Sequence, residues 1–179
     1  MFEPMLKQVG LFLAKLQFRN EVDTVQPMTE FFTGARSALI TLPVGYEEAI
    51  LASNAMRAFR NRLQHLQLTV VNNSTRATSL IDFPKCEVIR LDPADINRFS
   101  LPTKQTLQRI LQREYDVAID MNLDFVLHTA YICKASRAKV RVGFDYPGAD
   151  TFFNVLLNLD TQRSPQVLYE KFAACVGMF

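Results

Sequence analysis

Short apolar runs of strand length alternate with stretches of helical periodicity along most of the chain, and this alternation restricts the fold more than any other feature. The expected strands lie at residues 37–42, 66–71, 87–91, 115–121 and 139–144. The expected helices lie at residues 47–64, 103–114, 124–135 and 165–176, with a short helix or turn at 75–82 and a strand or helical turn at 152–159. Strands separated by helices of this length form βαβ units, in which neighbouring strands are parallel. The sequence therefore predicts the α/β class, as a single Rossmann-like open parallel sheet sandwiched by helices.

Residues 4–18, ahead of the first strand, carry a helical apolar period of their own. The apolar positions form one stripe along a helix: Met5, Leu6, Val9, Phe12, Leu13 and Leu16. Such a helix packs on its own domain or on a second subunit, or it lies on a membrane surface. Packing is the preferred interpretation, because only Lys7, Lys15 and Arg19 accompany a wide apolar face. We therefore expect an extra N-terminal amphipathic helix with its connection at residues 1–36, a domain at residues 37–179, and a homo-oligomer such as a dimer.

The composition excludes several classes of partner and site. The 179 residues include 20 Lys and Arg against 18 Asp and Glu, and a net charge of +2 provides no general field for binding nucleic acid. Cys86, Cys133 and Cys175 are widely spaced and do not cluster with the two histidines, so we expect reduced thiols and no metal site. No apolar run reaches the roughly 18 residues of a transmembrane helix. We expect a cytoplasmic protein without a transmembrane segment, and a peripheral position at the inner membrane is the alternative.

The sequence lacks the common phosphate-binding and nucleophile motifs. No G-x-G-x-x-G follows an expected strand, and neither a P-loop nor a G-x-S-x-G elbow occurs. His65 and His128 have no nucleophile beside them in the sequence. We therefore expect no bound cofactor and no hydrolase-type catalytic triad.

The loop after the first expected strand carries polar residues where open α/β sheets bind ligands, which is beyond the carboxyl ends of the strands. Gly45, Tyr46, Glu47 and Glu48 are the candidates for ligand binding in this loop. A carboxylate at this position could act as a general base on a hydroxyl group. The alternative is that the two acidic residues only stabilise the N-terminus of the following helix through its dipole.

Two further groups of polar residues are candidates for ligand binding. Asp120, Asn122 and Asp124 surround the end of the fourth expected strand and should face the same edge of the sheet, where they would bind hydroxyl groups or cap the next helix. Lys134 and Arg137 belong to the basic run KASRAKVR at residues 134–141, which would bind a phosphate or an anionic glycan, or would only stabilise the C-terminus of a helix.

Several of these segments, taken in their order, resemble the N-terminal half of the ADP-heptose:lipopolysaccharide heptosyltransferases of glycosyltransferase family 9. The resemblance covers residues 37–178. That family shows a Leu-Arg-x-Leu-like stretch, a Tyr-Asp-x-x-Ile-Asp strand and an Arg-x-Gly-Phe strand. Here the corresponding residues are 56–59 (MRAF), 115–120 (YDVAID) and 141–144 (RVGF).

The resemblance implies a GT-B architecture in the full enzymes, with the active site between two Rossmann-like domains. The N-terminal domain would hold the acceptor, which is the anionic inner core of lipopolysaccharide, and the C-terminal domain would hold the nucleotide sugar. An ungapped alignment back from Arg57 places Glu48 on the aspartate that is the family's proposed base, and Glu47 on the family's glycine. An alignment on Gly45 would place Tyr46 there instead. The loss of the family's glycine marks a departure in this loop.

The second domain of those enzymes has no counterpart in this sequence, so the expected function is narrower than that of the family. We expect a heptosyltransferase-like single domain that binds an anionic glycan acceptor or a partner chain, without a complete active site and therefore without catalysis on its own. One alternative is a true glycosyltransferase with Glu48 as base, assembled with a partner chain that supplies a nucleotide-sugar domain. The other is a non-catalytic scaffold on the same fold.

Overall fold

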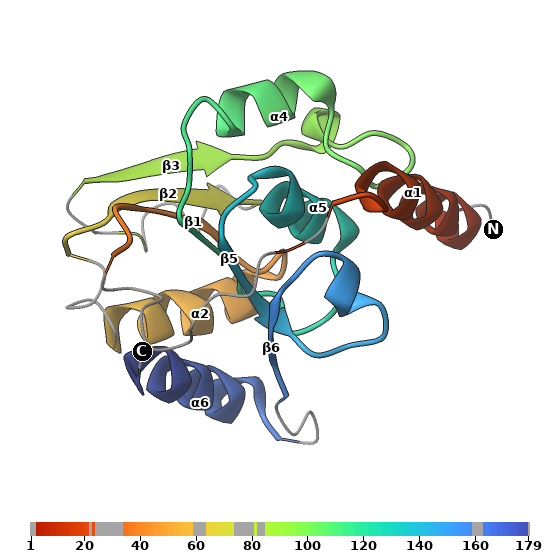
Figure 1. The fold of residues 1–179 in the computed structure, drawn as a ribbon. Coiled ribbons are helices and arrows are strands. Elements are labelled where there is room, and N and C mark those ends of the chain that lie inside the picture. Colours follow the sequence, from red (N-terminus) through yellow and green to blue (C-terminus); the bar gives the residue numbers. More distant parts are fainter. Residues whose placement is uncertain are drawn as a thin grey trace.

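The structure, a computed structural model, describes residues 3–21, 23, 34–58, 64–73, 81, 85–158 and 163–178. Its centre is a six-stranded sheet in the order β3-β2-β1-β4-β5-β6, in which all neighbouring strands are parallel (Figure 1). The strands are β1 (Ser37–Thr41), β2 (Gln67–Asn72), β3 (Cys86–Arg90), β4 (Val117–Asp120), β5 (Val140–Phe144) and β6 (Val155–Leu157). The predicted fold class, a single Rossmann-like open parallel sheet between helices, is confirmed.

Helices cover both faces of the sheet (Figure 1). One face is covered by α2 (Tyr46–Ala58) and α6 (Pro165–Met178), which pack on each other. The opposite face is covered by α4 (Lys104–Ile110), α5 (Leu127–Ala135) and α1 (Glu3–Phe18). The short 3₁₀ turn η3 (Pro93–Asp95) precedes α4, and the short 3₁₀ turn η4 (Ala149–Thr151) precedes β6. The apolar run at 152–159, expected as a strand or a helical turn, contains the strand β6. Most of the predicted short helix or turn at 75–82 lies outside the described residues.

Burial on both faces explains why the strands have continuous apolar runs. Leu39 and Ile40 are adjacent in β1 and both are fully buried, but Leu39 packs under α5 whereas Ile40 packs under α2. A strand with helices on both of its faces has no side facing solvent, so polar residues do not alternate with apolar ones along it.

Helix α1 packs against its own domain through one side only. Ala14 and Phe18 are buried, and the Phe18 ring lies 5.0 Å from the Tyr131 ring of α5 and 6.4 Å from the ring of Phe152. At Gly10 the helix comes so close to the loop before α4 that an added Cβ would lie 1.9 Å from the carbonyl oxygen of Phe99. Among the described helices, none combines the length and the apolar character that crossing a bilayer requires.

Candidate functional site

The chain reverses its direction of progress across the sheet between β1 and β4. From β1 the chain continues through α2 to β2 on one side, and from β4 it continues through α5 to β5 on the other side and on the opposite face. In open α/β sheets a crevice forms at this point beyond the carboxyl ends of the strands. We call the loops there the rim: residues 42–48 after β1, 121–126 after β4 and 144–147 after β5.

A fully buried carboxylate holds the centre of the rim together. Asp120, the last residue of β4, accepts hydrogen bonds from the hydroxyls of Thr41 and Thr129, each at 2.9 Å, and from Asn122 Nδ2 at 2.6 Å. The backbone N–H of Asn122 donates a further bond at 3.1 Å. Burial raises the pKa of Asp120, and these donors act in the opposite direction. Since the Asp120 side chain has no exposed surface, its contacts here are structural.

Asn122 connects Asp120 to the loop after β1 through hydrogen bonds. Its Oδ1 accepts a hydrogen bond of 3.2 Å from the backbone N–H of Val44, while its Nδ2 bonds Asp120 and the hydroxyl of Thr129. The side chain is buried. Asn122 therefore positions residues 42–48 relative to β4.

Glu48 lies at the rim in the first turn of α2, half-buried and folded back toward its loop. A Cβ added to Gly45 would lie 3.6 Å from Oε2 of Glu48. Burial raises the pKa of Glu48, and the negative charge of Asp124 raises it further. The two carboxylates are thus near enough to interact, and Glu48 is a stronger base than a free glutamate. Gly45, Tyr46 and Glu47 are exposed in the same loop, and of this predicted group the structure brings Glu48 into interaction with Asp124.

A small pocket of about 120 Å³ opens beside Asp124 at the carboxyl ends of β4, β5 and β6. At about 30 Å³ for each water, it has room for about four water molecules. Its lining combines carboxylates with aromatic and aliphatic side chains: Leu123, Asp124, Phe125, Phe144, Asp145, Tyr146, Leu157 and Leu168. The rings of Phe125 and Tyr146 pack 5.1 Å apart and form one rigid wall.

Tyr169 of α6 contacts the loop after β4 from the interior of the protein. Its hydroxyl donates a 2.8 Å hydrogen bond to the carbonyl oxygen of Met121, and its side chain is buried. Burial raises the pKa of Tyr169, and the charges of Glu48, Asp120 and Asp124 raise it further. Tyr169 therefore lies within the electrostatic influence of all three carboxylates, and it remains protonated as a hydrogen-bond donor at neutral pH.

Lys134 and Arg137 lie at the opposite edge of the sheet, because α5 runs from the end of β4 back to the start of β5. The Lys134 ammonium is buried and lies 3.2 Å from Oδ1 of Asp23, which also pairs with Arg141. Burial alone would raise the pKa of Asp23, but Arg141 and Lys134 together lower it. The exposed Arg137 follows the helix with φ 56°. The structure does not bring these two cations together with the rim.

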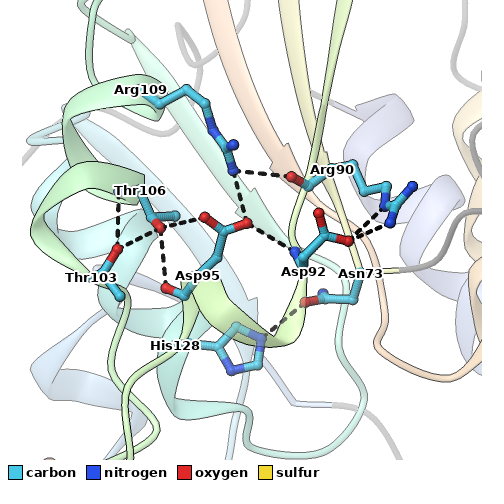
Figure 2. A network of polar contacts seen from close by, with 8 residues as sticks. All are labelled: Asn73, Arg90, Asp92, Asp95, Thr103, Thr106, Arg109 and His128. Carbon is cyan, nitrogen blue, oxygen red and sulfur yellow. Dashed lines mark hydrogen bonds and ion pairs between the residues drawn. The ribbon is translucent and has the colours of Figure 1, made fainter.

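A second polar network, which the sequence analysis did not identify, braces the turn between β3 and α4 (Figure 2). Asp95 accepts hydrogen bonds from the backbone N–H of Asp92 at 2.9 Å, from the Thr106 hydroxyl at 2.8 Å and from Arg109 at 3.0 Å. Arg109 also donates to the carbonyl oxygen of Arg90, and Thr103 caps α4. The spacing Asp-x-x-Asp at 92–95, which forms a capping box, was the available sequence signal.

This network borders an open polar pocket of about 490 Å³. Its lining includes two glutamines of α4, one glutamine after the helix, and residues in and around the network: Asp92, Ala94, Asp95, Thr103, Gln105, Gln108, Arg109 and Gln112. Arg109 and Asp95 pair with each other, and Asp92 pairs with Arg90. Because these charged groups already have partners, the network is a structural brace of η3 and α4.

His128 lies next to this brace, under the turn (Figure 2). Its Nε2 is 3.2 Å from Oδ1 of Asn73, which follows β2. Burial, together with the charge of Lys7, lowers the pKa of His128 to about 4. The ring is therefore neutral at physiological pH and serves as a packed, hydrogen-bonded side chain. Within the described ranges, no three metal-ligating side chains come together.

Solved glycosyltransferases share this fold. The glycosyl transferase family 9 structure from Veillonella parvula DSM 2008 matches 80% of this chain and 42% of its own, with a TM-score of 0.59 and 17% identity. The E. coli heptosyltransferase WaaC with ADP matches 78% of this chain and 46% of its own, with a TM-score of 0.58 and 15% identity. The chain has the fold of these proteins and spans less than half of their length.

Sequence comparison leads to a different family name. No curated protein matches the sequence. One family model, described as a family of unknown function (DUF6913), matches residues 51–171, which is about two thirds of the chain and includes β2 to β6, most of α2 and the first half of α6. The match includes Asp120, Asn122 and Asp124 of the rim and excludes Glu48. The chain belongs to this family of unknown function, DUF6913.

Proposed function

We propose that this chain is a glycosyltransferase-like domain that binds a glycan at its rim and corresponds to the acceptor-binding half of a family 9 enzyme. The observation that carries the proposal is the carboxylate pair Glu48 and Asp124 at the rim, beside the pocket walled by Phe125 and Tyr146. Carboxylates accept hydrogen bonds from sugar hydroxyls, and aromatic rings pack on the apolar faces of sugar rings. The likeness to two family 9 structures supports the sugar-binding reading at the level of fold.

The charges of the rim favour an uncharged glycan over an anionic one. Its three loops contain Glu47, Glu48, Asp124 and Asp145 and no Lys or Arg of their own. Lys7 of α1 adds one cation at the carbonyl oxygen of Phe125, and the carboxylates outnumber it. The anionic acceptor was expected from the resemblance to the heptosyltransferases, and the cations predicted to bind an anion, Lys134 and Arg137, lie at the other edge of the sheet. Phosphate groups placed against four carboxylates would be repelled, whereas neutral hydroxyl groups would gain charge-assisted hydrogen bonds.

Calorimetric titration of the full chain tests this proposal. The ligands are a neutral hexose or heptose oligosaccharide, a phosphorylated core oligosaccharide, ADP and ADP-heptose. We expect the neutral oligosaccharide to bind most tightly, and we expect Glu48→Gln and Asp124→Asn to weaken its binding by about tenfold or more, since each removes a charge-assisted bond. Glu114→Gln, an exposed change before β4, is the matched control.

Two results would contradict the proposal. One is the absence of heat with every ligand, which would leave a non-catalytic scaffold as the better account. The other is binding that Glu48→Gln and Asp124→Asn do not alter while the variants keep the wild-type unfolding midpoint.

A second candidate function is glycosyl transfer together with a partner chain that supplies the nucleotide-sugar site. The raised pKa of Glu48 favours it, because a carboxylate of higher proton affinity is a better general base toward a sugar hydroxyl. Where transfer from ADP-heptose is detected in the presence of such a partner, Glu48→Gln should reduce its rate by about 10² or more. An unchanged rate would exclude Glu48 as the base.

A further inference from the structure

Helix α1 has two apolar faces, and only one of them is used inside the domain. The inward face packs through Gly10, Ala14 and Phe18. The outward face, which we call the α1 stripe, has side chains that are 40–66% exposed: Met5, Val9, Phe12, Leu13 and Leu16. At 100° per residue the two faces lie on opposite sides of the helix, so packing on the domain does not account for the stripe.

The α1 stripe is a concentrated surface feature of this domain. Among the described residues, it holds five of the eight large exposed hydrophobic side chains; the others are Val44, Tyr46 and Leu156. Side chains of about 150–200 Å² that are half exposed give it an apolar area of roughly 450 Å². The largest apolar patch on a monomeric protein is typically about 300–600 Å² and is often functional, whereas single exposed hydrophobic residues need no explanation.

The charges along α1 indicate what the stripe contacts. Residues 3–20 contain three cations and one carboxylate, Glu3 at the start of the helix. Lys7 is turned inward, with Nζ 3.4 Å from the carbonyl oxygen of Phe125. Lys15 and Arg19 are exposed and follow each other one helical turn apart along one flank of the stripe. An apolar stripe with a purely cationic flank is complementary to a surface that is apolar below and anionic above.

We propose that α1 docks the protein on an anionic membrane surface, with the α1 stripe at the level of the acyl chains and Lys15 and Arg19 among the headgroups. Interfacial helices bind by this combination of apolar burial and attraction to anionic lipids. A second copy of the chain is the less suitable occupant. The stripe provides roughly half of the 800 Å² or so that each partner buries in a stable dimer.

Co-sedimentation of the full chain with vesicles tests the proposal. The vesicles are pure phosphatidylcholine, and an equal mixture of phosphatidylcholine and phosphatidylglycerol. We expect the protein to pellet with the mixed vesicles and to stay in solution with the neutral ones. Phe12→Ser combined with Leu16→Ser, and separately Lys15→Gln combined with Arg19→Gln, should each lower the partition coefficient by about tenfold or more.

Matched controls separate the stripe from general effects. Leu156→Ser removes an exposed apolar side chain elsewhere, and Lys85→Gln with Lys104→Gln removes the same amount of charge away from α1. Both should partition like the wild type, and all variants should keep the wild-type circular dichroism spectrum and unfolding midpoint.

Three results would overturn the proposal. The first is a wild-type protein that stays in solution with both kinds of vesicle. The second is pelleting that the two α1 variants do not reduce. The third is a dimer in light scattering that Phe12→Ser with Leu16→Ser dissociates, because that result would assign the stripe to a second copy.

Discussion

At the scale of single residues, the site depends on which carboxylates are buried and which are not. Asp120 and Asp124 are four positions apart and both follow or end β4, yet Asp120 has no exposed surface whereas Asp124 lines a pocket. The sequence placed both at the same edge of the sheet. Alternation along β4 predicts that Asp120 faces α5, as Ala118 does, whereas Asp124 lies beyond the strand in the following loop. What the pattern could not reveal was the cage of Thr41, Asn122 and Thr129, since Thr41 is 79 positions away in the chain.

We predict that Asp120→Asn lowers the free energy of unfolding by about 2–4 kcal/mol. Four donor groups bond to the Asp120 carboxylate, and the asparagine amide has only one oxygen to accept from them. Its NH₂ group also brings donors that have no acceptor there, and unpaired donors are costly in a buried site. Denaturant titration measures the change. Glu47→Gln, an exposed change in the same rim, is the control and should stay within about 0.5 kcal/mol. A wild-type stability for Asp120→Asn would show that the cage is not structural.

The lowered pKa of His128 leads us to predict that the free energy of unfolding depends on pH. Its pKa is about 4 in the folded protein and about 6.5 in the unfolded chain, so the unfolded state takes up a proton first as the pH falls. The contribution of His128 is fully present above pH 6.5 and is lost progressively toward pH 4. Between pH 7.5 and pH 5 this loss amounts to about 2 kcal/mol.

Denaturant titrations of His128→Gln at the two pH values check this dependence. The variant keeps a hydrogen-bonding side chain next to Asn73 but cannot take up a proton there. Between pH 7.5 and pH 5 its free energy of unfolding should therefore fall by about 2 kcal/mol less than that of the wild type. His65→Gln is the matched control, because His65 is exposed, and it should follow the wild type. Equal pH dependence of the wild type and His128→Gln would contradict the account.

At the scale of elements, strands were predicted more closely than helices. Each observed strand from β1 to β5 lies within about two residues of its predicted run, because burial on both faces produces a continuous apolar run with clear ends. Helix ends were less accurate. The helix expected at 103–114 ends at Ile110, and the one expected at 124–135 begins at Leu127, because residues 121–126 form the rim loop. Helical periodicity continues through such loops when their apolar side chains are also buried.

The close approach of α1 at Gly10 leads to a prediction at this scale. In Gly10→Ala the new Cβ would lie 1.9 Å from the carbonyl oxygen of Phe99, so α1 or the loop before α4 has to move. We expect a loss of about 1–3 kcal/mol in the free energy of unfolding and faster proteolysis between α1 and β1. Gly34→Ala is the control, since nothing lies within 4 Å of its added Cβ. Equal protease resistance of the two variants would show that α1 does not need this contact.

At the scale of the whole molecule, topology decides which predicted residues can act together. Parallel strands bring the loops after β1, β4 and β5 to one edge, and they bring the C-terminus of α5 to the other. This separation removes Lys134 and Arg137 from the rim, and Lys134 instead pairs with Asp23 in the chain that follows α1. From the sequence, the acidic residues after the strands and the basic run at 134–141 were two separate candidates for ligand binding. The structure instead separates an acidic rim, which we propose binds a neutral glycan, from an apolar helix flanked by cations, which we propose docks on an anionic membrane.

The central claim, that the rim binds an uncharged glycan, is tested most directly by mapping the binding surface. Two-dimensional ¹⁵N–¹H spectra of the full chain would be recorded with increasing amounts of a neutral hexose or heptose oligosaccharide. The account predicts shift changes concentrated at residues 42–48, 121–126 and 144–147, which Glu48→Gln weakens and Glu114→Gln leaves unchanged. Shift changes around Lys134 and Arg137 at the opposite edge of the sheet, or none at saturating oligosaccharide, would contradict it.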